Sequence, residues 1–128
     1  MQWFLTLSQV FIACAMLDVW LIRYNRPGVF RGGSARTMAE EFRVYGLPDG
    51  FRNFIRVSKL TAGALMIAGI WLPILAVIAG VVLAVLMAGA VTMHLKVKDP
   101  LYKALPSSTF LILSILVAYF QWDRMGVG

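Results

Sequence analysis

The most constraining feature of this chain is an apolar run from Pro73 to Leu95 that contains no Asp, Glu, Lys or Arg. A transmembrane helix needs about 20 predominantly apolar residues, and a proline is tolerated in its first turn. A second such run, Trp3 to Ile22, is interrupted by one charged residue, Asp18. The whole chain is 60% hydrophobic and 14% charged, whereas a soluble domain carries about 25% charged residues. The sequence therefore predicts an integral membrane protein.

Two more helices complete the predicted fold. Residues 106–122 form another apolar segment opened by a proline. Residues 60–72 are also apolar but cover only about 20 Å at 1.5 Å per residue, so this helix must begin upstream, near Gly50. We therefore predict one all-α membrane domain over residues 1–128, an integral membrane antiparallel four-helix bundle. The expected spans are residues 3–22, 51–72, 73–95 and 106–122.

A cleaved signal peptide is the alternative role for the first apolar segment. The N-terminus lacks a basic region and the apolar run continues beyond Cys14, which favours a retained span. Because Cys14 is the only cysteine, an internal disulfide and thiol–disulfide exchange are excluded.

The one long connection, residues 23–50, is rich in arginine and glycine. The spacing from Thr37 to Glu40 is that of a capping box, and Gly46 is expected to end the short helix that follows. One face of this helix carries Met38, Phe42 and Tyr45. We expect an interfacial helix with this face toward the lipid; packing as a cap on the ends of the bundle is the alternative.

Basic residues are distributed unequally between the two sides of the predicted bundle. All but one of the 12 Lys and Arg residues lie in 23–59 or 96–103, and the exception is Arg124. The positive-inside rule then places both connections in the cytoplasm and both termini outside. In so apolar a chain, the net charge of +6 favours membrane lipids with anionic headgroups as partners, and no nucleic acid.

Several ionisable residues fall inside the predicted membrane core. At 1.5 Å per residue, Lys59 and Arg56 lie about 18 and 22 Å from Trp71, and Asp18 lies about 22 Å from Trp3. Such groups normally face the protein interior and pair, so we expect an ion pair of Asp18 with Lys59 or Arg56. The alternative has the two cations reach the headgroups while Asp18 bonds a neighbour. The candidate ligand-binding residues are Asp18, Arg56, Lys59 and His94, with the aromatic neighbours Trp20 and Tyr24.

Motifs for catalysis are absent from the sequence. It contains no glycine-rich phosphate loop, no metal-ligand spacing and no recognisable nucleophile with a base, so no catalytic or metal-binding residue is expected. Small residues recur every four positions from Ala76 to Ala88, a pattern that lets helices approach closely. This stripe faces either a neighbouring helix of the same chain or a second copy in a homodimer.

Three segments resemble the DoxX-like family of small four-helix bacterial membrane proteins. They are residues 59–73, residues 85–100 with the run from Gly89-Ala90 to His94-Leu-Lys-Val-Lys-Asp-Pro100, and Ala104-Leu-Pro106. The resemblance covers roughly residues 45–118 and implies an inner-membrane location and a quinone-linked oxidoreductase context. Many relatives carry an acidic residue early in the second span, where this chain has Ser58 and Lys59, so a role for that carboxylate does not carry over.

Two functions are compatible with these observations. The first is a non-enzymatic or accessory subunit that binds a quinone-like or lipid-like ligand at the level of Asp18, Arg56 and Lys59, next to an oxidoreductase. The alternative is a small proton-coupled transporter acting as a dimer, because small multidrug transporters also have four short helices and a carboxylate in the first. Such transporters lack a connection as long as residues 23–50, which favours the first function.

Overall fold

The computed structural model describes residues 2–22, 24–25, 31–33 and 35–126. The regular structure among these residues is helical, with turns and loops between the helices and no strand. The elements are α1 (Gln2–Leu17), a π-helical turn η1 (Asp18–Ile22), α2 (Met38–Tyr45), α3 (Asp49–Ala68), α4 (Pro73–Lys96), a 3-10 turn η2 (Leu101–Ala104) and α5 (Leu105–Arg124).

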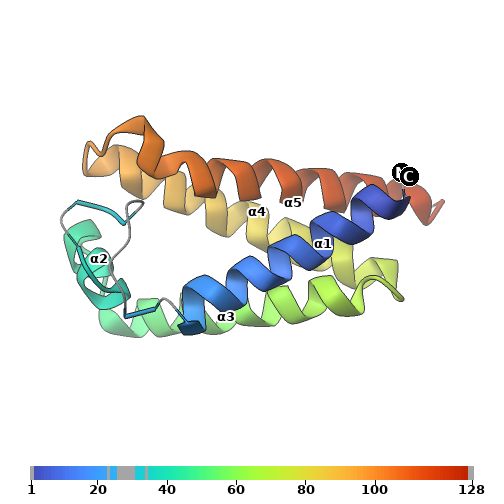
Figure 1. The fold of residues 1–128 in the computed structure, drawn as a ribbon, viewed down its shortest axis with the longest axis horizontal. Helices are drawn as coiled ribbons and strands as arrows, with labels where there is room; N and C mark the ends of the chain where they lie inside the picture. The colour runs from blue at the N-terminus through green and yellow to red at the C-terminus, as the bar shows by residue number, and fades with distance from the viewer. Residues whose placement is uncertain (1, 23, 26–30, 34, 127–128) are drawn as a thin grey trace.

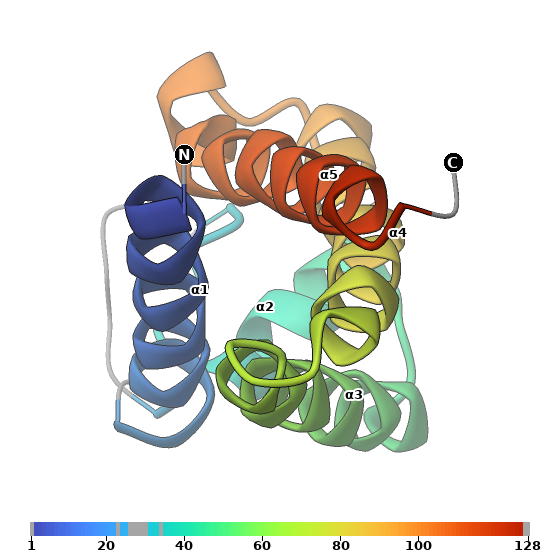
Figure 2. The same ribbon diagram turned by 90° about the vertical axis from the view of Figure 1, so that its right-hand side faces the viewer.

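The four long helices lie side by side, and each runs opposite to the one before it (Figure 1). The start of α1 and the end of α5 lie at one end of the molecule, and α2 lies across the other. Viewed from the end, α1 stands opposite α4, and α3 stands opposite α5 (Figure 2). The packed neighbours are α4 with α5, α3 with α4, and α1 with α3. This arrangement places α2 over one end of the long helices.

Three helical segments are long and apolar enough to cross a membrane, judged among the described residues. They are Gln2–Ile22, Pro73–Lys96 and Leu101–Arg124, which correspond to the predicted first, third and fourth spans. Helix α3 begins at Asp49, which confirms the predicted start near Gly50. It is not among the three, because its first half carries Arg52, Arg56 and Lys59.

The outer surface of these helices is apolar. Trp3, Trp71 and Trp122 are 69%, 74% and 43% exposed, and they stand where α1 begins, where α3 turns into α4 and where α5 ends. All three positions lie at the end of the molecule away from α2 (Figure 1). Tryptophans gather where a membrane meets water, and an extended apolar surface suits lipid rather than water.

Close helix packing explains part of the small-residue stripe. A Cβ atom added at Gly80 would lie 2.7 Å from the carbonyl oxygen of Ser114, so glycine lets α4 approach α5 at this point. Ala76 is fully buried, whereas Ala88, at the other end of the stripe, is exposed. The first half of the stripe therefore packs within the chain.

Buried amides join the middle of α1 to the last turns of α3 and α5. Gln121 Nε2 donates to Gln9 Oε1 at 2.6 Å, and Gln9 Nε2 donates to the carbonyl oxygen of Met66 at 2.9 Å. Both glutamines are almost fully buried. These bonds connect α5 to α1 and α1 to α3, so each buried amide has a partner.

Helix α2 begins and ends where the sequence predicts. The Thr37 hydroxyl accepts from the Glu40 N–H at 3.2 Å, and Gly46 ends the helix with φ 78°, a left-handed conformation that glycine adopts without strain. The prediction that the aromatic face of this helix lies against lipid is wrong. Phe42 is 7% exposed, and its ring centroid lies 6.1 Å from that of Trp20, so α2 packs as a cap on the ends of the long helices.

Candidate functional site

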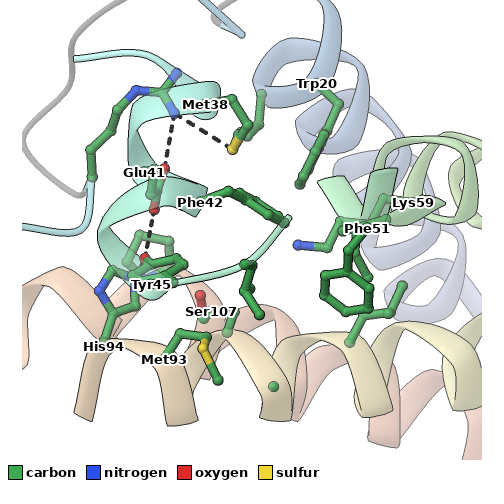
Figure 3. Close-up of a pocket in the computed structure, with 18 of the residues that line it drawn as sticks. Trp20, Met38, Glu41, Phe42, Tyr45, Phe51, Lys59, Met93, His94 and Ser107 are labelled. Carbon is green, nitrogen blue, oxygen red and sulfur yellow. Dashed lines mark hydrogen bonds and ion pairs between the residues drawn. The ribbon is translucent and has the colours of Figure 1, made fainter. Parts of the chain in front are cut away.

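A cavity of about 490 Å³ lies between α2 and the long helices (Figure 3). Its size falls within the range of about 300 to 1,000 Å³ that is usual for small-molecule sites. Its apolar wall includes Trp20, Phe42, Phe51, Ile55, Leu86 and Met93. Its polar lining consists of Arg31, Glu41, Tyr45, Lys59, His94, Lys103 and Ser107.

The π-helical turn η1 positions the aromatic part of the cavity. Its widened turn carries Trp20, whose side chain is 2% exposed and lines the cavity. The carbonyl oxygen of Trp20 accepts from Arg56 Nε at 3.2 Å, and the Arg56 guanidinium lies 4.4 Å from the centre of the Tyr24 ring. π-Helical turns are often found at functional sites, and here one fixes an aromatic wall.

Lys59 is the buried cation of the apolar wall. The residue is 8% exposed, and its Nζ lies 4.9 Å from the centre of the Trp20 ring. Its side chain points across the cavity toward Phe42 (Figure 3). Within the described part of the chain, this ammonium makes a cation–π contact but no hydrogen bond and no ion pair.

A chain of hydrogen bonds forms the opposite wall. Arg31 Nη1 donates to Glu41 Oε2 at 2.9 Å, and the Tyr45 hydroxyl donates to Glu41 Oε1 at 2.7 Å. The same hydroxyl lies 3.5 Å from His94 Nε2. Burial raises the pKa of the Tyr45 phenol, and the charge of Glu41 and the bond to it raise it further. Tyr45 therefore stays protonated and acts as a hydrogen-bond donor.

Asp99 connects this wall to the glycine-rich segment. Its Oδ2 lies 2.8 Å from His94 Nδ1, and its Oδ1 accepts from the Gly33 N–H at 2.9 Å. Lys103 Nζ donates to the Gly33 carbonyl oxygen at 2.7 Å. Burial alone would raise the pKa of Asp99, but the bonds from His94 and Gly33 and the charge of Lys103 outweigh it, so the pKa lies below its usual value. The carboxylate is ionised and holds the loop against the end of α4.

The structure brings together only part of the predicted site. Trp20, Lys59 and His94 line the cavity, whereas Arg56 and Tyr24 stack on each other beside it. Asp18 is half-buried and is not one of the residues that line the cavity.

The expected ion pair of Asp18 with Lys59 or Arg56 is replaced by other contacts. Lys59 lies over the Trp20 ring, and Arg56 bonds the Trp20 carbonyl oxygen. The physical reason is that Trp20 offers each cation another contact: its ring face meets the Lys59 ammonium and its carbonyl oxygen accepts from Arg56 Nε. The ring face compensates the charge of Lys59 only in part.

Sequence reasoning missed the cavity residues that the long connection contributes. Glu41 and Tyr45 stand four residues apart on α2, which places them on one face, and this spacing could have indicated their bond. Arg31 carried no such signal, because its partner Glu41 is ten residues away. The bond of Asp99 to the Gly33 N–H, 66 residues away, could not be predicted either. No group of three or more His, Cys, Asp or Glu side chains suited to a metal ion occurs among the described residues.

Apolar helices with exposed tryptophans at their ends, and a capped cavity between them, define a small helical membrane protein. The chain belongs to the DoxX-like family, whose profile matches residues 26–117. The match includes α2 to α4 and most of α5 but leaves out α1. A curated relative from Bacillus subtilis (strain 168), the uncharacterized protein YdgD, is 30% identical over 91 residues, which is 70% of this chain and 80% of YdgD. No solved structure matches the chain.

Proposed function

We propose that this protein is a non-enzymatic, multi-pass protein of the bacterial inner membrane that binds a quinone-like or lipid-like ligand in the cavity beneath α2. Its four long helices form an antiparallel bundle in the membrane, with α3 as the second span. The observation that carries the proposal is Lys59, a buried ammonium in an aromatic wall with an open volume beside it.

The residues present fit an amphipathic ligand. Lys59 Nζ is a donor suited to a ring carbonyl or a headgroup oxygen. The rings of Trp20, Phe42 and Phe51 offer flat apolar surface for a ring or a hydrocarbon chain. A ligand site of this kind combines a mostly apolar wall with a few polar groups that fix orientation.

The proposed orientation places the cavity at the cytoplasmic side, with both termini outside. It rests on the unequal distribution of Lys and Arg between the two ends of the helices. A variant with Cys14→Ala and Met125→Cys should react with a membrane-impermeant maleimide on intact cells. Reaction only after the cells are broken would show that the termini lie in the cytoplasm and would contradict the proposed orientation.

Binding by an accessory subunit explains the site better than transport by a dimer. A proton-coupled transporter would need a carboxylate in its substrate pathway that is free to take up and release a proton. Asp18 does not line the cavity, and Glu41, which does, is held by Arg31 and the Tyr45 hydroxyl. We therefore propose that the protein serves a quinone-linked oxidoreductase as a ligand-binding partner subunit.

Fluorescence of Trp20 tests the proposal. With Trp3, Trp71 and Trp122 replaced by Phe, the remaining indole is the buried one at the cavity. We expect ubiquinone-1, or a brominated acyl lipid, to quench it with saturation in nanodiscs.

The matched variants are Gly89→Leu and Ala88→Leu. Gly89 lines the cavity and a Cβ atom there meets nothing within 4 Å, so leucine should fill the cavity and abolish saturable quenching. Ala88 is exposed and does not line the cavity, so its variant should behave as the parent. Equal, non-saturating quenching in all three proteins would overturn the proposal.

A further inference from the structure

The charges that line the cavity do not balance. The lining includes the cations Arg31, Lys59 and Lys103 and one carboxylate, Glu41. The imidazole of His94 also lines it and bonds Asp99, which stands just behind the wall.

Two of the three cations are matched by a carboxylate. Arg31 Nη1 lies 2.9 Å from Glu41 Oε2. Lys103 Nζ lies 3.9 Å from Asp99 Oδ1 and donates to a backbone carbonyl oxygen at 2.7 Å. Both carboxylates are also held by other donors, from Tyr45 to Glu41 and from Gly33 to Asp99.

Lys59 is the lining cation with which neither carboxylate forms an ion pair in the described part of the chain. Its ammonium lies 4.9 Å from the centre of the Trp20 ring. Glu41, the one carboxylate among the described lining residues, is already bound by Arg31 and Tyr45. A buried charge is expensive unless it is paired. A ring face alone supplies only part of that compensation.

We infer that the ligand of this cavity is a monoanionic amphiphile, a single carboxylate or similar acid group on a hydrocarbon chain or ring, whose anion pairs with Lys59. The inference rests on the proposed function and names the class of ligand for the same site. One negative charge matches the one unbalanced cation, and a second would meet the carboxylate of Glu41 on the opposite wall.

The apolar part of such a ligand has a place in the same cavity. Ile55, Leu86 and Phe42 line it around Lys59. Two lining residues, Phe51 and Val85, are 41% and 67% exposed, so the cavity reaches the outer surface at α3 and α4. A hydrocarbon chain can lie along this route with its acid group inside, and its end can reach the lipid.

Matched neutral and anionic probes test the inference. In nanodiscs of a zwitterionic lipid, palmitate should displace a fluorescent acyl probe from the protein at about ten- to hundredfold lower concentration than methyl palmitate, the range for a hydrogen bond to a charged group. Lys59→Met should remove this preference, and Lys59→Arg should keep it. Lys98→Met removes one exposed charge outside the cavity and should leave the preference unchanged.

The outcomes separate this inference from the proposed function. If methyl palmitate and ubiquinone-1 bind as well as palmitate, and Lys59→Met changes nothing, the anionic ligand is overturned while a ligand-binding cavity stands. If none of these compounds displaces the fluorescent acyl probe and Gly89→Leu does not change the quenching of Trp20, the proposed function itself fails. If phosphatidylglycerol competes as well as palmitate, the anion is confirmed and its source is the membrane lipid.

Discussion

At the scale of residues, the cavity depends on a few side chains that fix the long connection to the helix ends. Asp99, His94, Tyr45, Glu41 and Arg31 form a continuous series of contacts between the α4–α5 turn and the loop before α2. Buried polar groups of this kind are stabilising only while every member has its partner. Removing one member should therefore affect the cap as a whole.

Asp99 gives this series a predictable pH dependence. Its pKa is lower in the folded protein than in the unfolded chain, so its contribution is present above the unfolded pKa, about 3.9, and is lost as the pH falls through the folded value. Asp99→Asn should destabilise the protein by about 1.5 to 3 kcal/mol at pH 7. Thermal unfolding in detergent should show this difference shrinking below pH of about 4, and the exposed Asp123→Asn should show none. A difference that is constant with pH would contradict this assignment.

Gly32 makes room for the Tyr45 ring. A Cβ atom at this position would lie 2.5 Å from Tyr45 Cε1, so Gly32→Ala must displace the ring or the loop and should cost about 1 to 3 kcal/mol. At Gly50, in the first turn of α3, a Cβ atom meets nothing within 4 Å. Gly50→Ala is the matched control and should be neutral or slightly stabilising. Equal melting temperatures for the two variants would count against this packing.

At the scale of elements, the sequence predicted helix ends better than helix neighbours. The cap at Thr37, the stop at Gly46 and the early start of α3 are local, because each follows from a residue type and its spacing. The partner of the aromatic face of α2 was not predictable, since periodicity shows that a face is apolar but not what covers it. The π-helical turn at residues 18–22 was missed for a similar reason: its composition is that of an ordinary helix.

The glutamine contacts between α1, α3 and α5 allow an independent test of helix placement. Gln9→Leu would leave the buried Gln121 amide without its acceptor, and Gln121→Leu would leave Gln9 Oε1 without its donor. We expect each single variant to lose about 0.6 to 1.7 kcal/mol, and the double variant to lose less than the sum. Chemical unfolding in detergent micelles measures the coupling. Strict additivity would show that the two amides do not meet.

At the scale of the whole molecule, membrane character and family were accessible from the sequence, and the site was accessible only in part. Apolar length and charge asymmetry are properties of the chain alone, and the family resemblance rested on short residue runs within it, residues 59–73 and 85–100 above all. Depth along a helix placed Lys59, Arg56 and Asp18 at one level, but depth does not specify direction. The sequence therefore predicted an ion pair for Asp18, whereas Lys59 and Arg56 contact the ring and the carbonyl oxygen of Trp20.

The proposed function requires that the cavity be a binding site rather than a packing defect. The most direct measurement is an X-ray structure of the protein crystallised with 11-bromoundecanoate, in which anomalous scattering locates the bromine. We expect a carboxylate within hydrogen-bond reach of Lys59 Nζ and a bromine peak inside the cavity, between Phe51 and Val85. An empty cavity, with bromine only in the outer groove formed by Gly80, Ala118 and Tyr119, would contradict it.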